Sequence, residues 1–163
     1  MVRQIADDIP EQKVIDDVAR YGWHCMNVLA EDASPGFSFT IGHFHSNGRP
    51  EFIIVGLRPE VAHKVLGLAV DAMQSGAIVD LSLPTDKLLN GYPCVFVQVP
   101  ESEYHEYVGF CRWYYEGNAF PLYQIVWPSK HGQFPWHPEA SAAFRATQPV
   151  IGHAGGGANP GDH

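Results

Sequence analysis

The chain is poor in basic residues and in cysteine, and it has no long apolar segment. Ten lysines and arginines stand against eighteen aspartates and glutamates, and the basic residues form no cluster. Because nucleic-acid binding requires clustered cations that displace phosphate counterions, we expect neither nucleic acid nor an anionic membrane surface as a partner. No apolar run approaches the roughly 18 residues of a membrane span, and we expect no signal peptide at the N-terminus.

The few cysteines also indicate a compartment. The chain has three cysteines, Cys25, Cys94 and Cys111, which lie far apart in the sequence and form no CxxC motif. This pattern predicts free thiols in a reducing compartment, so we expect a cytoplasmic protein. The chain also has no GxGxxG after a strand, no P-loop, no HExxH and no GxSxG. These absences argue against dehydrogenases, NTPases, zincins and α/β-hydrolases that depend on a single such motif.

What remains has the composition of a globular domain, with 45% hydrophobic and 17% charged residues. We find no repeat and no internal linker, so residues 1–151 are expected to form one domain. Residues 152–163 are rich in glycine and proline, which predicts a flexible tail.

Hydrophobic periodicity predicts about three helices and about six strands. The helices are expected over 9–21, 59–75 and 102–117. The strands are expected over 23–30, 37–45, 51–57, 77–83, 93–100 and 120–127, with the second and third forming a hairpin. Because the strands mostly follow one another in pairs, the order predicts an α+β fold, with a mostly antiparallel sheet or small open barrel.

A segment rich in histidine lies at the end of the first strand of this predicted hairpin and in the turn that follows it. His43 and His45 are two positions apart in the predicted strand, which would place both imidazoles on one face. Glu51 could add a carboxylate, giving a set with metal-ligand spacing. The alternative is that all three are ordinary polar residues of a strand end and loop. Spacing alone is a weak signal, so we assign no metal and keep the three residues only as candidates.

The same turn could form a polar clamp for an anionic or amide ligand. His45, Arg49 and Glu51 would supply its polar groups, and the planar fork of arginine suits carboxylates and phosphates. The alternative is an ordinary turn with a surface pair between Arg49 and Glu51, which would stabilise little. His63 lies away from the apolar stripe of its helix, and it joins the site only if that helix turns it toward His45.

Tyrosine and tryptophan are dense in the C-terminal part of the chain. Their apolar rings and polar tips suit pocket walls, and the alternative is a core with an oligomer interface. The proline-rich loop 127–138 could form a lid. The residues concerned are Tyr104, Tyr107, Trp113, Tyr114, Tyr115, Tyr123, Trp127 and Trp136.

Four segments carry a family resemblance: GFSFTIGHFHSNGRPEFIIVGL, AHKVL, LYQIVWPSKHGQFPW and TQPVIG. In this order they resemble the bacterial family known as domain of unknown function DUF4262, over about residues 14–152. The resemblance implies no activity. Its matching positions are Thr40, Ile41, Gly42, His45, Pro50, Glu51, His63, Gln124, Trp127, Pro128 and 134–136. Arg49 stands where the family often has histidine, and His43 stands where it often has an apolar residue, which puts a family metal site in doubt here.

Two hypotheses of function follow. The first is a small-molecule or peptide-binding module, with its site between the turn 45–51, the helix 59–75 and the loop 127–136. The second is an enzyme that uses a flavin on a sheet like that of a split barrel, a metal, or His45 and His63 as acid–base groups. The sequence leaves the cofactor, the catalytic residues and homo-oligomer formation open. The predicted ligand-binding residues are His45, Arg49, Glu51, His63, Gln124, Trp127 and Trp136.

Overall fold

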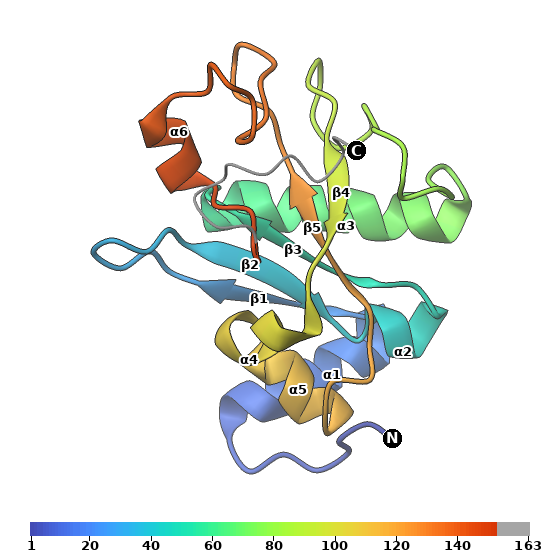
Figure 1. Cartoon of the computed structure of the whole chain (residues 1–163). Helices are drawn as coiled ribbons and strands as arrows, with labels where there is room; N and C mark the ends of the chain where they lie inside the picture. The colour runs from blue at the N-terminus through green and yellow to red at the C-terminus, as the bar shows by residue number, and fades with distance from the viewer. Residues whose placement is uncertain (153–163) are drawn as a thin grey trace.

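A mixed β-sheet lies at the centre of the computed structural model, which describes residues 1–152 (Figure 1). Within these residues the sheet has five strands in the order β1–β2–β3–β5–β4 and does not close into a barrel. All neighbouring strands are antiparallel except β3 and β5, which run parallel. The predicted α+β class and the predicted hairpin are confirmed. The strands are β1 (His24–Val28), β2 (Phe37–Ile41), β3 (Glu51–Val55), β4 (Val95–Gln98) and β5 (Leu122–Val126).

Helices cover both faces of the sheet (Figure 1). One face packs against α3 (Pro59–Ser75), and the other packs against α1 (Ile9–Tyr21), α4 (Tyr104–Tyr107) and α5 (Gly109–Tyr115). Alternate residues of a strand point to opposite faces. Phe52 and Ile54 therefore lie in the core beside α3, whereas Ile53 and Val55 lie in the core beside α1 and α5. This double burial explains the unbroken apolar run in β3.

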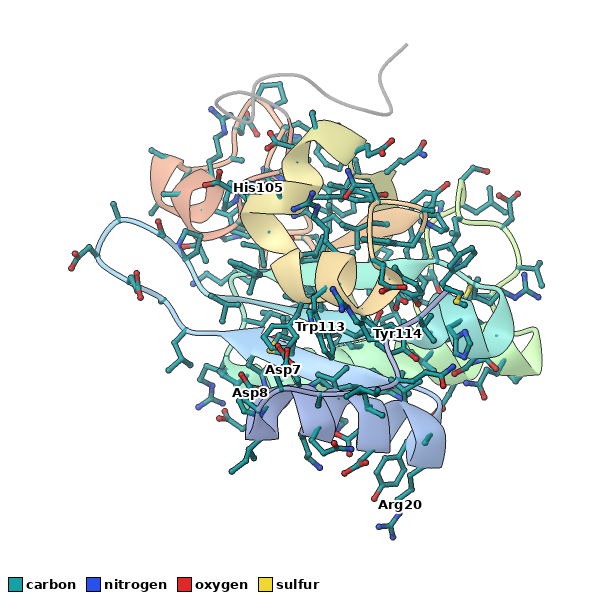
Figure 2. The ribbon with its side chains drawn as sticks, turned by 90° about the horizontal axis from the view of Figure 1, so that it is seen from below. Asp7, Asp8, Arg20, His105, Trp113 and Tyr114 are labelled. Carbon is teal, nitrogen blue, oxygen red and sulfur yellow. The ribbon has the colours of Figure 1, made fainter. Side chains whose placement is uncertain are left out.

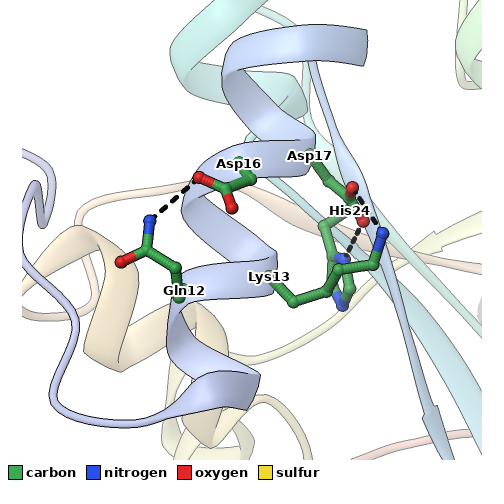
Figure 3. Close-up of polar contacts among 5 residues, drawn as sticks. All are labelled: Gln12, Lys13, Asp16, Asp17 and His24. Carbon is green, nitrogen blue, oxygen red and sulfur yellow. Dashed lines mark hydrogen bonds and ion pairs between the residues drawn. The ribbon is translucent and has the colours of Figure 1, made fainter.

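α1 has the bounds that the sequence predicts, and the side chain of Asp8 caps its N-terminus. Asp17 ties this helix to β1, because its carboxylate accepts hydrogen bonds from His24 Nδ1 at 2.7 Å and from Lys13 Nζ at 2.8 Å (Figure 3). Partial burial raises the pKa of Asp17, but these two hydrogen bonds outweigh burial and hold the pKa below its usual value. α3 also has its predicted bounds.

Two predicted strand segments are not strands. Residues 43–45 belong to a short helix, α2 (His43–Asn47), which begins after Gly42 with a φ of 98°. Residues 77–83 lie in the irregular connection between α3 and β4. There the Asp80 carboxylate accepts hydrogen bonds from the backbone N–H and the hydroxyl of Ser82. Such local bonds compete with strand pairing, which accounts for five strands where about six were expected.

The C-terminal helices also differ from prediction. The helix expected over 102–117 is divided into a 3₁₀ turn at Glu101–Glu103, α4 and α5, with the break at Val108 (φ −121°, ψ 48°). A further helix, α6 (Ala142–Thr147), was not predicted, although Ser141 caps it by accepting a hydrogen bond from the Phe144 N–H. None of the helices formed by residues 1–152 is both long and apolar enough to span a membrane. The predicted tail lies, after Gly152, outside the described residues.

Candidate functional site

The predicted site residue Glu51 is fully buried at the first position of β3. Its carboxylate accepts hydrogen bonds from the Thr40 hydroxyl at 2.6 Å and from the Tyr115 hydroxyl. It also accepts from three consecutive backbone N–H groups, those of residues 42–44, at 3.0, 3.2 and 3.1 Å. These N–H groups lie at the start of α2, where backbone N–H groups have no hydrogen-bond partner within the helix. The carboxylate therefore holds the turn that the sequence singled out.

Burial raises the pKa of Glu51, and the hydrogen bonds from Thr40, Tyr115 and the backbone oppose that rise. Five donors occupy a group that offers about four lone-pair positions. Glu51 consequently has no free acceptor with which to bind a ligand, and its geometry is that of a structural residue.

His43 is buried on the same turn, and its neighbour His45 is exposed. The prediction that the two imidazoles share one strand face is wrong, because α2 replaces the strand. His43 Nδ1 lies 3.0 Å from the Pro50 carbonyl oxygen and donates to it. Its buried Nε2 has no hydrogen-bond partner among the described residues. Burial lowers the pKa of His43, so the ring is neutral near pH 7.

These positions bear on the candidate metal set of His43, His45 and Glu51. Within residues 1–152 no group of three histidine, cysteine, aspartate or glutamate side chains is arranged to hold a metal ion. The Glu51 oxygens are occupied by donors. The two histidines lie in different surroundings, one buried and one exposed. The structure therefore does not bring the candidate set together.

The rest of the predicted clamp is spread over two faces of the molecule. His45 packs its ring edge-on to Tyr114 of α5, with ring centroids 6.2 Å apart. His63 lies exposed on α3, edge-on to Trp23 at 5.7 Å. Arg49 is exposed and forms no ion pair with Glu51 in the described part of the chain. Because α3 and α5 cover opposite faces of the sheet, His45 and His63 are not brought together.

The aromatic half of the predicted site lies at the other end of the central strands. β3 and β5 are parallel, and Glu51 is paired with Leu122 at the beginning of both strands. Trp127 follows the last residue of β5, and its indole Nε1 donates to the carbonyl oxygen of Val55, the last residue of β3, at 2.8 Å. The structure thus divides the predicted residues between the two ends of this strand pair.

Two buried glutamines fasten the C-terminal segment to the sheet. Gln124 donates from Nε2 to the Pro149 carbonyl oxygen at 3.1 Å, and its Oε1 accepts from the Ile151 N–H at 2.9 Å. Gln148 accepts from the Trp127 N–H at 2.9 Å and donates to the Trp127 carbonyl oxygen at 2.7 Å. Both amides use a donor and an acceptor within the protein. Gln124, predicted to bind a ligand, therefore binds the backbone of the C-terminal segment in this structure.

Trp127 forms the floor of a cavity together with Phe144 of α6. The two rings meet edge to face, with centroids 5.3 Å apart. The cavity has a volume of about 500 Å³ and lies between the segment after β5 and the start of α6. Its other lining residues are mostly polar: Ser129, Lys130, His131, Gln133, Glu139, Ala140 and Ser141.

Trp136 does not line this cavity. Its half-buried ring stacks on Phe134, with centroids 5.2 Å apart, and packs beside Val97 and Val126. Among the residues that line this cavity, Trp127 is the one that belongs to the seven predicted ligand-binding residues.

The sequence does not identify Gln148 or Phe144 as site-forming residues, and it indicates Tyr115 only as one of the aromatic residues of the C-terminal part. Gln148 falls in the TQPVIG segment, which was noticed only for its family resemblance. Its bonds to Trp127 span 21 positions, and the Tyr115 bond to Glu51 spans 64 positions. No local spacing rule connects residues so far apart. The N-cap serine before α6 was the available signal for Phe144.

The geometry defines an α+β domain with an open mixed sheet and an aromatic cavity at the end of its parallel strand pair. A model of the family described as "Domain of unknown function (DUF4262)" matches residues 17–141, and the chain belongs to this family. The resemblance seen in the sequence is thus confirmed over residues 17–141, and the TQPVIG segment lies outside this match. No curated protein and no solved structure matches the chain.

Proposed function

We propose that the protein is a binding module for a small molecule that has a flat apolar part and polar substituents. The observation that carries this proposal is the fixation of Trp127. Its backbone N–H and carbonyl are both bound by Gln148, and its indole N–H is bound by Val55. Two of these hydrogen bonds fix the backbone of Trp127 and the third fixes its indole ring, so the ring loses little further freedom when a ligand covers it, which favours binding.

The shape and composition of the cavity agree with this class of ligand. Small-molecule sites typically have volumes of about 300–1,000 Å³, with apolar walls and a few convergent polar groups. Here Trp127 and Phe144 supply the apolar floor, and the surrounding loop supplies the polar rim. The cavity of about 500 Å³ fits a small molecule rather than a long peptide.

The rim favours a ligand with hydrogen-bond acceptors. Ser129 Oγ accepts from the backbone N–H groups of His131 and Gln133, and Ser141 Oγ accepts from that of Phe144. Both hydroxyls keep their own hydrogen for donation. With the Lys130 ammonium nearby, the rim offers donors to a carbonyl or similar oxygen, while Glu139 supplies an acceptor.

The proposal can be tested by ligand-observed NMR with a library of heteroaromatic carbonyl fragments. We expect hits whose binding is lost in Phe144→Ala. The matched control is Phe110→Ala, because Phe110 is also half-buried and edge-on to a tryptophan, Trp113, but lies on α5. Hits that bind Phe144→Ala and wild type equally, with both proteins folded, would show that this cavity is not the site.

A further inference from the structure

A second cavity, of about 560 Å³, lies between the N-terminal segment, the second half of α1, α2 and α5. It shares no lining residue with the cavity of Trp127 and has a different character. Its polar lining consists of Arg3, Gln4, His45, Ser46 and Tyr114. No aspartate or glutamate is among the described residues that line it. The lining thus carries a cationic and several neutral polar side chains in a chain with a net charge of −8.

Arg3 is held in place by the C-terminal end of α5. Its backbone N–H donates to the Tyr114 carbonyl oxygen at 2.8 Å, and its side-chain Nε donates to the Trp113 carbonyl oxygen at 3.2 Å. The guanidinium also lies 5.9 Å from the centre of the Trp113 ring. A cation is favourable near the end of a helix where carbonyl groups are exposed. Figure 2 shows Trp113 and Tyr114 on this part of α5.

Arg3 nevertheless retains binding capacity. Its two terminal nitrogens, with four N–H groups, make no hydrogen bond to any residue in the described part of the chain. Its ion pair with Glu116 is long, at 3.7 Å from Nε, and both side chains are more than two-fifths exposed. Exposed pairs of this kind are weak, so an incoming anion can compete with Glu116.

His45 is positioned by the buried Glu51 network. Its backbone N–H donates to the Tyr115 hydroxyl oxygen at 3.1 Å, and that hydroxyl donates to Glu51. The His45 ring then rests against Tyr114, and the next residue, Ser46, also lines the cavity. The buried carboxylate thus fixes the α2 side of the cavity without entering it.

The acidic residues of α1 lie outside the lining of this cavity. Asp8 and Arg20 lie at opposite ends of the helix (Figure 2), and the half that lines the cavity is the half that ends near Arg20. Asp16 accepts a hydrogen bond from Gln12, and Asp17 is bonded to Lys13 and His24 (Figure 3).

We propose that this cavity binds a small organic anion, with its carboxylate or phosphate group held by Arg3, His45 and the Ser46 hydroxyl. Arginine suits such groups because its donors form a planar fork. The ligand's organic part packs on the apolar side of the cavity, formed by Ile15 and Val18, and on the Tyr114 ring. This site is independent of the proposed function at Trp127, and either can fail alone.

The test is a ¹H–¹⁵N NMR titration of the full chain with sodium benzoate and, separately, with sodium phosphate, at constant ionic strength. We expect saturable shifts of the amides of Arg3, His45, Ser46 and Tyr115 with at least one probe. Saturation by benzoate alone identifies a carboxylate site, and saturation by phosphate alone identifies a phosphate site. Shifts that grow linearly with both probes overturn the proposal.

Two variants and one control distinguish a site from general attraction. Arg3→Gln should weaken binding about tenfold or more, because charge-assisted hydrogen bonds are lost. His45→Gln leaves the contacts of Arg3 with α5 in place and should weaken binding about threefold or more. Arg58→Gln removes an exposed cation at the start of α3 and should leave binding unchanged. Equal affinity in wild type, Arg3→Gln and His45→Gln overturns the proposal.

Discussion

Tyr115 on α5 donates its phenolic hydrogen to the carboxylate of Glu51, which lies 64 positions earlier at the start of β3. The Tyr115 oxygen also accepts a hydrogen bond from the His45 N–H. Through Thr40 the same carboxylate reaches β2. The buried Glu51 carboxylate therefore joins β2 and β3 to α2 and α5. We expect its removal to lower the free energy of unfolding of the whole domain.

Replacing Glu51 by glutamine should lower the free energy of unfolding by about 2–4 kcal/mol. A glutamine amide has one acceptor oxygen, and its NH₂ group would face backbone N–H donors of residues 42–44. Urea unfolding followed by circular dichroism measures the change. The control is Glu116→Gln at an exposed position, which should change stability by less than about 0.5 kcal/mol. Equal effects of the two variants would contradict the structural role given to Glu51.

The Glu51 carboxyl should titrate above its ordinary value of 4.5, because burial raises its pKa in the folded protein. A raised folded pKa means that this group's contribution to stability is present below the unfolded value and is lost as pH rises through the folded pKa. Carboxyl ¹³C NMR measures the midpoint. Tyr115→Phe and Thr40→Val each remove a hydrogen bond that lowers the pKa, so each should move the midpoint upward. A downward movement would contradict this assignment.

Gln148→Ala should loosen the segment that carries Trp127. Without the amide, the Trp127 N–H and carbonyl lose their partners, and we expect a loss of about 2–3 kcal/mol. Hydrogen exchange of the Trp127 amide should accelerate, while amides of β1 keep their protection in urea-free buffer. Gln98→Ala, at the exposed end of β4, is the matched control. An unchanged Trp127 amide in Gln148→Ala would refute the clamp.

The three cysteines should react slowly with a disulfide reagent at neutral pH while the protein is folded. All are free. Burial raises the pKa of Cys25 to about 11 and that of Cys94 to about 12, and it raises the pKa of Cys111 well above its usual value. Cys25 is only half-buried and should react first, so Cys25→Ser should remove the first phase. In urea, three thiols should react at once. Fast labelling of a folded thiol would contradict these surroundings.

The sequence predicted α1 and α3 with both of their bounds, and the reasons are local. Each helix has a proline at its start, an apolar stripe and a glycine just after its end. Local signals failed at α2, because polar and apolar residues still alternate in His43-Phe44-His45, although the phase of the alternation reverses after Gly42. What ends the strand is Gly42 in a left-handed conformation and a carboxylate nine positions later.

The candidate site shows the same limit. The dense aromatic residues of the C-terminal part predict a pocket wall at Trp127, and Trp127 does line a cavity. Glu51 and Gln124 were chosen as polar residues in family-like motifs, yet both are buried and bonded within the protein. A sequence motif indicates that a polar side chain has a partner at that position. Only the tertiary structure shows whether this partner is a ligand or another group of the protein. Binding roles of His45, Arg49, His63 and Trp136 stay predictions.

The parallel pairing of β3 with β5 has a consequence for synthesis of the chain. All five residues of β3 are buried, yet the strand that covers one of its edges begins only at Leu122. Until that part has been translated, β3 is an unprotected edge with an apolar surface, which is the kind of strand that recruits other chains. Nascent or truncated chains that end before Leu122 should therefore aggregate, and their survival would depend on chaperones.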